Sequence, residues 1–537
     1  MIRLFDNWLY LNTLFFIQLF SLKQVHTFNE MFAIIISLVV IAAVVYYRRY
    51  RSFYSHWDKR GIPAIPGSVP WGSYSSRSHM RQYQGFSLDK FYYKMTNHPY
   101  FGFYDMRSPI LIAKDPEVIR LILTKEFSHF IDRTYTGLPK TDPLLHYQLF
   151  SLSGNKWRAL RTKLTPTFTS GRMKAMFPLF LDCAQGLNSL LWSRVGSIVD
   201  VKDAVARFTT DVICSCAFGL QTNTVVEPNH PLRKAAADFL AFGDSLYLKF
   251  RLLLTLLSPF RIPFNRFTPK SVEDYIMKLI SDTVEYREKN KITRNDFLEL
   301  LIQLKNKGSL KDERKEEVEE NFEINLDVMA AQSFLFFFAG YETSSSVQTF
   351  CLYELALNQD IQQKLRNEIQ EVIKIHGEVT YQAVNDMKYL HMVVSETMRK
   401  YPTLPALMRR CVIPFTMPDG GKIQKGDQIF IPIWSLQHDP QYFPDPEKFD
   451  PERFSQENER NIIPYTYLPF GGGPRMCIGN RFGLLQTKVG LITVIRNFQV
   501  LPCDKTSIPL KLVKNSNNIT ACEGPIILKL IPTAPEN

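Results

Sequence analysis

The chain has 537 residues, 45% of them hydrophobic and 13% aromatic, and its formal net charge is +12. This composition suffices for a large core, and the eight scattered cysteines indicate a reduced compartment and not a disulfide framework. The positive charge suits nucleic acid, an anionic membrane or an acidic protein partner, but no sequence motif supports nucleic acid. With no internal repeat or long linker, the residues after 60 are predicted to form one large, mostly helical body.

Two apolar stretches open the chain, and the second has the length of a membrane anchor. Trp8 to Leu22 is weakly apolar, whereas Met31 to Tyr47 is almost purely apolar and near the ~20 residues that span a bilayer. Arg48, Arg49 and Arg51 follow at once, and cationic flanks stay cytoplasmic, so we expect the body on the cytosolic side. A cleaved secretory peptide is the alternative; the basic cluster and the lack of a small-residue cleavage site disfavour it.

The next part of the chain is predicted to be extended. Trp57 to Gly67 contains Pro63 and Pro66, which predicts a stiff, extended exit from the anchor. Tyr100 to Ile112 alternates in polarity and is predicted to form a hairpin, and the residues from Asp115 begin a short helix.

A basic region surrounds a helical tryptophan and arginine. Phe127 to Leu149, which precedes them, has no clear period. Trp157 and Arg161 are four residues apart and share a helix face, so the indole N–H and the guanidinium could bind one carboxylate. The alternative is an ordinary helix with a packed tryptophan. The basic residues of this region are Lys156, Arg158, Lys163, Arg172 and Lys174.

Two later segments are predicted to lie at the surface. Leu246 to Phe267 is rich in Leu and Phe with interspersed cations, which favours a membrane-dipping lip near a substrate entrance; a buried helix end is the alternative. Lys305 to Glu320 is a mixed charge run, which is typical of a solvated loop and helix start.

A long apolar helix is predicted from Leu326 to Tyr353, with small and polar residues at 339–344. Gly340 weakens such a helix by roughly 1 kcal/mol relative to Ala, and a hydroxyl bonded one turn back bends it further, so a notch is expected. Glu342 and Thr343 would place an acid and an alcohol beside an apolar wall, which suits proton delivery to dioxygen. The alternative is a core helix with a packing glycine. The neighbouring Phe334, Phe336, Phe337 and Phe338 are predicted to be cavity or core residues.

A single cysteine follows a glycine run near the C-terminus. Gly471 to Gly473 and Pro474 cannot continue a helix or strand, so they predict a bare loop. Helical spacing resumes after Cys477, which places the thiol near a helix N-terminus, where a thiolate is favoured, with Arg475 nearby. With no other Cys or His in the loop, the thiolate could ligate a metal whose other positions are filled by a cofactor such as haem. The alternative is a loop cysteine that enters a buried helix.

This loop resembles the haem-binding loop of the cytochrome P450 family, Phe-x-x-Gly-x-Arg-x-Cys-x-Gly, at all fixed positions. Residues 339–344 resemble the family's Ala/Gly-Gly-x-Asp/Glu-Thr-Thr/Ser pattern. Glu396 and Arg399 match its Glu-x-x-Arg pair, which on an arbitrary helix would be a weak surface pair, and Arg453 of a Pro-Glu-Arg-Phe segment matches the third partner. The resemblance extends from Trp57 to the C-terminus, and it implies the mainly α P450 fold with a small β-rich part, preceded by an N-terminal membrane anchor.

The resemblance also implies roles for single residues. Cys477 would be the axial ligand of the iron of haem b, and Thr343 and Glu342 would deliver protons in catalysis. The other residues implied to bind the cofactor are Trp157, Arg161, Arg409 (with Arg410 as the adjacent alternative), Arg475 and Phe470. Glu396, Arg399 and Arg453 would be structural.

Microsomal members of the family usually begin at a residue placed like Met31. The segments are therefore predicted as an extension at residues 1–30 that is absent from or irrelevant to the working protein, a transmembrane anchor at 31–50, a linker and hinge at 51–67, and a haem-thiolate domain at 68–537.

The chemistry implied by the resemblance is monooxygenation of a lipophilic small molecule at the endoplasmic reticulum membrane, as in insect microsomal members that oxidise xenobiotics. Electrons would come from a separate NADPH–cytochrome P450 reductase docked on the basic region around Trp157, with cytochrome b5 as a further partner. A reductase-independent haem-thiolate isomerase and a non-catalytic haem-binding protein are the alternatives. The acid–alcohol pair disfavours the isomerase, and the basic face with the oxygen groove disfavours the non-catalytic protein.

Overall fold

The computed structural model describes residues 28–68, 71–74, 84–106, 108–133, 139–242, 266–294, 296–306, 323–513 and 519–533. Helices predominate in these residues and the sheets are small, which confirms the predicted mainly α fold. The helices are α2 (Phe28–Phe53), α4 (Gln84–Lys94), α5 (Pro116–Arg120), α6 (Pro143–His146), α7 (Gly154–Leu164), α8 (Ser170–Trp192), α9 (Val201–Ile213), α10 (Pro231–Phe242), α12 (Lys270–Asn290), α13 (Phe297–Asn306), α14 (Leu326–Leu357), α15 (Gln359–His376), α16 (Tyr381–Asp386), α17 (Lys388–Lys400), α18 (Ile433–Gln437) and α19 (Asn480–Asn497).

The strands of the described residues form three small sheets. The largest has the order β1-β2-β7-β4, in which β2 and β7 are parallel and the other pairs are antiparallel. The other two have the orders β3-β9-β8 and β5-β6. The strands are β1 (Tyr100–Asp105), β2 (Ser108–Ala113), β3 (Ile198–Asp200), β4 (Leu407–Arg410), β5 (Phe415–Thr416), β6 (Lys422–Ile423), β7 (Gln428–Ile431), β8 (Phe498–Leu501) and β9 (Ile527–Pro532). The antiparallel β1–β2 pair confirms the predicted hairpin, and Asp115 caps α5 as the acidic start predicted.

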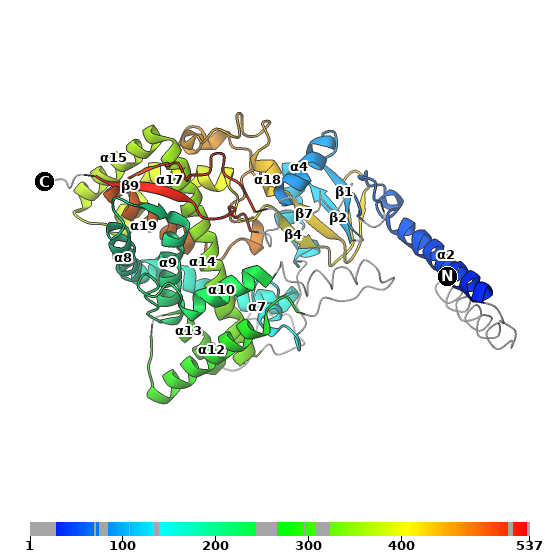
Figure 1. Cartoon of the computed structure of the whole chain (residues 1–537), viewed down its shortest axis with the longest axis horizontal. Helices are drawn as coiled ribbons and strands as arrows, with labels where there is room; N and C mark the ends of the chain where they lie inside the picture. Colours follow the sequence, from blue (N-terminus) through cyan, green and yellow to red (C-terminus); the bar gives the residue numbers. More distant parts are fainter. Residues whose placement is uncertain are drawn as a thin grey trace.

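Helix α14 runs through the middle of the helical part (Figure 1). It packs against α6, α9, α12, α17 and α19, so most of its circumference is buried. A helix that is apolar all round needs such surroundings, because no side of it can face water at low cost. Asn325 is the N-cap of this helix, because its side-chain oxygen accepts a hydrogen bond from the Val328 amide.

Helix α2 projects from the body at the end that holds the four-stranded sheet (Figure 1). Its side chains from Ala33 to Arg48 are exposed or half-buried. Of the described residues, those of Ala33–Arg60 contain a helical stretch long and apolar enough to cross a membrane.

The segment predicted as a linker is fixed to the body from Trp57 onwards. The Trp57 side chain is fully buried, and its indole N–H donates to the Phe103 carbonyl at 3.3 Å. The Ile65 amide donates to the Gly102 carbonyl, and the Gly102 amide donates to the Pro63 carbonyl. A Cβ at Gly102 would lie 2.3 Å from the Trp57 ring, so only glycine permits this approach. Trp57 to Gly67, predicted as a stiff, extended part of the linker and hinge at 51–67, is thus held against β1 by burial of one large indole.

The predictions for Trp8–Leu22, Leu246–Phe267 and Lys305–Glu320 fall wholly or largely outside the described residues.

Candidate active site

The loop before α19 is shaped by two glycines and one tight backbone contact. Gly471 and Gly473 have φ values of +72° and +68°, a region that glycine adopts readily. A Cβ at Gly473 would lie 1.8 Å from the Leu123 carbonyl oxygen, so a side chain there would displace the loop. The Cys477 amide then donates to the Phe470 carbonyl at 2.9 Å, which turns the cysteine towards the cavity three residues before α19.

The thiol of Cys477 faces the cavity while protein surrounds it on its other sides. Burial raises the pKa of Cys477, and a hydrogen bond from the Gly479 backbone and the charges of Arg161 and Arg133 oppose that rise. The sequence predicted Arg475 as the nearby cation, whereas the cations that act on the thiol in the structure are Arg161 and Arg133. A bound metal ion would still hold the sulfur as a thiolate.

A largely apolar cavity of about 260 Å³ lies in front of Cys477. Helix α14 supplies one wall of it with residues spaced three and four apart, which therefore share one face. These residues are Leu335, Phe336, Ala339, Gly340, Thr343, Ser344 and Val347. Of the four phenylalanines predicted as cavity or core residues, Phe336 lines the cavity and Phe334 and Phe337 are buried in the core.

Gly340 and Thr343 shape this wall in different ways. A Cβ at Gly340 would lie 2.7 Å from the Ile213 side chain, so the glycine lets α9 approach α14 closely. The Thr343 hydroxyl donates to the Ala339 carbonyl at 2.7 Å, the contact one turn back that the sequence predicted. Thr343 lines the cavity, as do Ser344, Thr403 and Thr487, so its hydroxyl is one of those available to a bound ligand.

Glu342 does not share the position of Thr343. It is buried but is not among the described residues that line the cavity, because successive helix residues point about 100° apart. Burial raises the pKa of Glu342, opposed by the charge of Lys202 and by a hydrogen bond with Tyr341. The sequence placed the acid beside the apolar wall, whereas in the structure the acid lies behind it.

Four cationic side chains gather at the cavity. Arg409 and Arg475 are 1% and 2% exposed, and burial together with the charge of Arg133 lowers their pKa values to about 9 and about 8. Arg133 and Arg161 also line the cavity, and burial lowers the pKa of Arg133 to about 10. Of the described acidic side chains, Asp132 alone forms an ion pair with this group, at 3.6 Å from Arg475. Buried cations with so little acid nearby require an anionic ligand.

Arg409 carries the sharpest sign of a missing partner. Its Nε is buried and has no hydrogen-bond partner among the described residues. Arg409 pairs with Ile429 across β4 and β7 and points to the cavity, whereas Arg410 is exposed, as alternation along a strand requires. Of the two adjacent candidates, the structure places Arg409 at the cavity.

Trp157, Arg161 and Phe470 also line the cavity. Trp157 is 3% exposed, and the Arg475 guanidinium lies over its ring at 4.1 Å from the centroid. Arg161 donates to the Met476 carbonyl at 2.9 Å, one residue before the cysteine. The predicted common face of Trp157 and Arg161 is therefore present and is directed at the cysteine loop.

Arg133 also lines the cavity, although no sequence motif pointed to it. It stacks on Phe150 at 4.0 Å and donates to the Arg475 carbonyl at 2.9 Å, which joins it to the cysteine loop. The segment that holds it shows no helical or strand period, so the sequence carried no signal beyond the presence of a cation.

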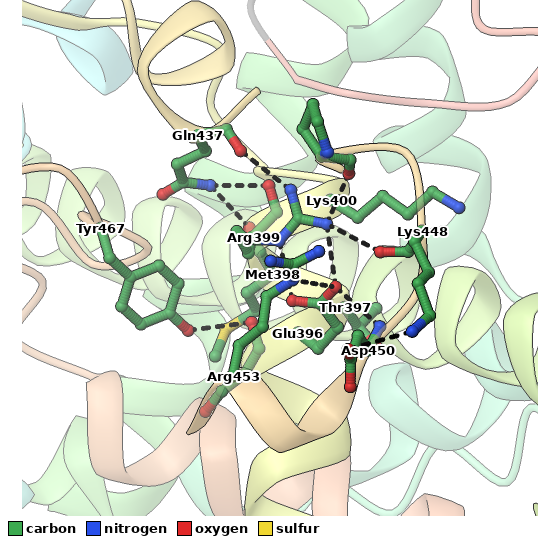
Figure 2. A network of polar contacts seen from close by, with 12 residues as sticks. Glu396, Thr397, Met398, Arg399, Lys400, Gln437, Lys448, Asp450, Arg453 and Tyr467 are labelled. Atoms are coloured by element: carbon green, nitrogen blue, oxygen red, sulfur yellow. Dashed lines mark hydrogen bonds and ion pairs between the residues drawn. The ribbon is translucent and has the colours of Figure 1, made fainter. Parts of the chain in front are cut away.

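The predicted structural pair lies away from the cavity, on α17. Arg399 donates to both carboxylate oxygens of Glu396, at 2.7 and 2.9 Å, and both side chains are fully buried (Figure 2). Arg453 approaches the same carboxylate at 3.5 Å. The remaining Arg399 N–H groups donate to the Gln437 and Pro446 carbonyls, so the Glu396–Arg399 pair is satisfied within the protein. The Arg453 Nε has no hydrogen-bond partner among the described residues, but it is ion-paired with Glu396.

Comparison with known proteins assigns the chain. The family model for cytochrome P450 matches residues 71–530. The chain is 40% identical to cytochrome P450 6k1 of Blattella germanica, over 91% of this chain and 95% of that protein. It is 39% identical to cytochrome P450 6a2 of Drosophila melanogaster, over 90% and 96%. The chain belongs to the cytochrome P450 family. It is thus a P450 monooxygenase, and P450 enzymes bind haem b through a cysteine thiolate.

The cavity of this P450 fits that cofactor. Its donor set is one thiol that faces the cavity and a group of buried cations, one of them with an unpaired Nε. A thiolate suits haem iron, and buried guanidinium groups suit the two carboxylates of haem.

Proposed function

We propose that this P450 inserts one oxygen atom from dioxygen into a lipophilic small molecule, with electrons from NADPH supplied through a separate reductase. The observation that carries the proposal is the cavity itself, whose apolar α14 wall faces the thiol of Cys477. An apolar cavity with few polar groups binds lipophilic ligands and excludes water. The similar cytochromes P450 come from insects, which supports an enzyme that oxidises xenobiotics. Metabolism of hormones or lipids is the alternative.

Within this proposal, Cys477 is the iron ligand, and the cations at the cavity hold the haem carboxylates. Arg409 and Arg475 neutralise them from buried positions, and Trp157 with Arg161 contacts them from α7. Phe470 packs at the haem. When bound, haem supplies the activation of dioxygen and its transfer.

Thr343 and Glu342 act in succession in this proposal. The Thr343 hydroxyl lies at the cavity and donates its hydrogen bond to the Ala339 carbonyl, which keeps the hydroxyl proton beside the cavity. Glu342 lies buried behind the wall, and burial raises its pKa, so it holds a proton more readily than an exposed carboxyl does. We assign proton supply to Glu342 and proton delivery to Thr343.

The proposed electron donor is NADPH–cytochrome P450 reductase, with cytochrome b5 as a second partner. Arg158 is exposed on α7, the helix that holds Trp157. Two further exposed cations, Arg172 and Lys174, lie on the next helix, α8. An exposed basic face attracts an acidic protein and raises its rate of association.

The proposed location is the endoplasmic reticulum membrane, with α2 as a single anchor and the catalytic domain in the cytosol. The apolar stretch of α2 and the arginines at its end support this orientation. Residues 1–30 are proposed to be dispensable, which N-terminal sequencing of the native protein tests.

The first test is the carbon monoxide difference spectrum of the reduced protein, for the wild type and Cys477→Ala. We expect a thiolate-type band in the wild type and its loss in the variant. NADPH consumption with purified reductase and a panel of lipophilic compounds then tests monooxygenation. Product that forms from peroxides without reductase would instead favour an isomerase, and a thiolate band with no turnover would favour a non-catalytic haem protein.

A further inference from the structure

A buried glutamine on α14 lies one helical turn before the cavity wall. Gln332 precedes the cavity residues Leu335 and Phe336 by three and four positions, so it lies on the same helix face. It is fully buried and is not among the described residues that line the cavity. The side chain is thus close to the wall without forming it.

The amide of Gln332 binds the segment that supplies another part of the wall. Its Oε1 accepts from the Leu149 amide at 2.8 Å, and its Nε2 donates to the Tyr147 carbonyl at 2.6 Å. Leu149 and the next residue, Phe150, line the cavity. One side chain therefore pairs with two backbone groups of this segment, as a neighbouring strand would.

The same segment is fastened on both sides of that contact. Before it, the buried Asp142 accepts hydrogen bonds from the Phe267 and Thr268 amides at 2.7 and 3.0 Å, which ties the start of α6 to the residues before α12. After it, Arg475 donates to the Leu152 carbonyl at 2.7 Å. The wall residues lie between these two contacts, where Gln332 joins them to α14 by hydrogen bonds. The Phe150 carbonyl also accepts from Arg133 and Arg475.

We propose that Gln332 is a positioning residue, which fixes the wall formed by Leu149 and Phe150 and so determines the size and shape of the ligands that the cavity accepts. The Leu149 N–H is buried and lies outside any helix or strand, so without Gln332 it has to find another partner. The wall then moves, since a shift of the backbone is the available way to pair it. The inference rests on the proposed function of the cavity as the substrate site.

The test uses Gln332→Met in the holoenzyme and spectral titration with two azoles that ligate haem iron. Methionine keeps the length of the side chain and removes both hydrogen bonds. Imidazole is small, whereas a biphenyl-substituted imidazole fills more of the cavity and is the ligand expected to contact the wall. We expect the variant to bind the biphenyl azole about tenfold less tightly, and imidazole within about twofold of wild type.

Gln362→Met is the matched control. Gln362 is also fully buried, donates to the Leu355 and Val500 carbonyls at 2.9 and 2.8 Å, and accepts from the Val500 amide. It lies on α15 and is not among the described cavity residues. A loss of general stability affects both variants, whereas a change in the ratio of the two azole affinities is expected for Gln332→Met alone.

Gln332→Glu keeps the acceptor for Leu149 and removes the donor to Tyr147, so an intermediate ratio is expected; it also decides the question if Gln332→Met yields no holoenzyme. The inference is wrong if the Gln332 variants keep the wild-type ratio of the two azole affinities, which includes the case in which both azoles bind equally less tightly. It is also wrong if Gln362→Met changes this ratio as much as Gln332→Met does. If the wild type binds neither azole, the proposed haem site is wrong as well, which separates the two failures.

Discussion

Two groups of buried arginines in this P450 contrast in how their charge is balanced. On α17, Arg399 is paired with Glu396 through two short hydrogen bonds, and its other N–H groups reach backbone carbonyls (Figure 2). At the cavity, Arg409 and Arg475 are equally buried, but Asp132 at 3.6 Å is the one described acid paired with that group. The Glu396–Arg399 pair is satisfied within the chain, whereas the arginines at the cavity lack a comparable acidic partner among the described residues.

The comparison separates a scaffold from a binding site on physical grounds. Charges buried in pairs hold backbone segments together, and removal of one partner leaves the other uncompensated. Burial of cations without acidic partners costs free energy in the empty protein, and the binding of carboxylates offsets that cost. The two groups should therefore respond in opposite ways to loss of an arginine.

The largest effect is expected for Arg399→Met. The Glu396 carboxylate would remain buried without its partner, so the free energy of unfolding should fall by about 3–5 kcal/mol. Denaturant titration of the holoenzyme measures this. Lys364→Met is the control, because its pair with Glu452 is exposed and should contribute about 0–1 kcal/mol. Similar losses in the two variants would contradict the scaffold role of the α17 pair.

A large effect of another kind is expected for Arg409→Met. Haem should transfer to apomyoglobin about tenfold faster or more, since a charge-assisted hydrogen bond contributes about 1.5–3 kcal/mol. Denaturation should change much less than in Arg399→Met. Arg410→Met, the exposed neighbour on β4, should keep the wild-type rate. If Arg409→Met loses stability as Arg399→Met does, the contrast between the two groups fails.

Within the cavity, Thr343→Val removes the hydroxyl and keeps the shape of the side chain. We expect product formed per NADPH to fall by about tenfold or more, with unchanged haem content, because positioned proton donors contribute about 10²–10⁴ in rate. Thr349→Val is matched, since its hydroxyl donates to the Ser345 carbonyl on the same helix but away from the cavity. If both variants form the same amount of product per NADPH, Thr343 does not deliver the proton.

The smallest effect is expected at the surface. Arg158→Glu reverses an exposed charge, so the apparent affinity for reductase should weaken a few-fold, by about 1 kcal/mol or less, and the difference should shrink as salt rises. Lys90→Glu, on α4 near the anchor, serves as the control. Reductase kinetics at two ionic strengths measure both, and equal effects of the two variants would place the docking face elsewhere.

Much of this site could be predicted from local sequence. The glycines around Cys477 need positive φ or close contact, and the Glu396–Arg399 spacing places the two side chains on one helix face. The Thr343 contact with Ala339 likewise follows from helix geometry. These features depend on residues a few positions apart, so the chain alone carries the information.

Other features depended on segments far apart in sequence. The sequence did not separate Arg409 from Arg410, which required the pairing of β4 with β7, and it missed Arg133 and Gln332 because their partners are remote. It also placed Glu342 at the wall and gave no sign that Trp57, within the predicted linker and hinge, is buried, because packing against other elements decides both positions.

The sequence by itself thus determined the family, the haem-thiolate chemistry and the helix that faces the cysteine, because short motifs with fixed spacing carry them. Only the tertiary structure decided which buried charges are satisfied within the chain and which await a ligand. Desolvation depends on everything packed around a group, and no local pattern reports that.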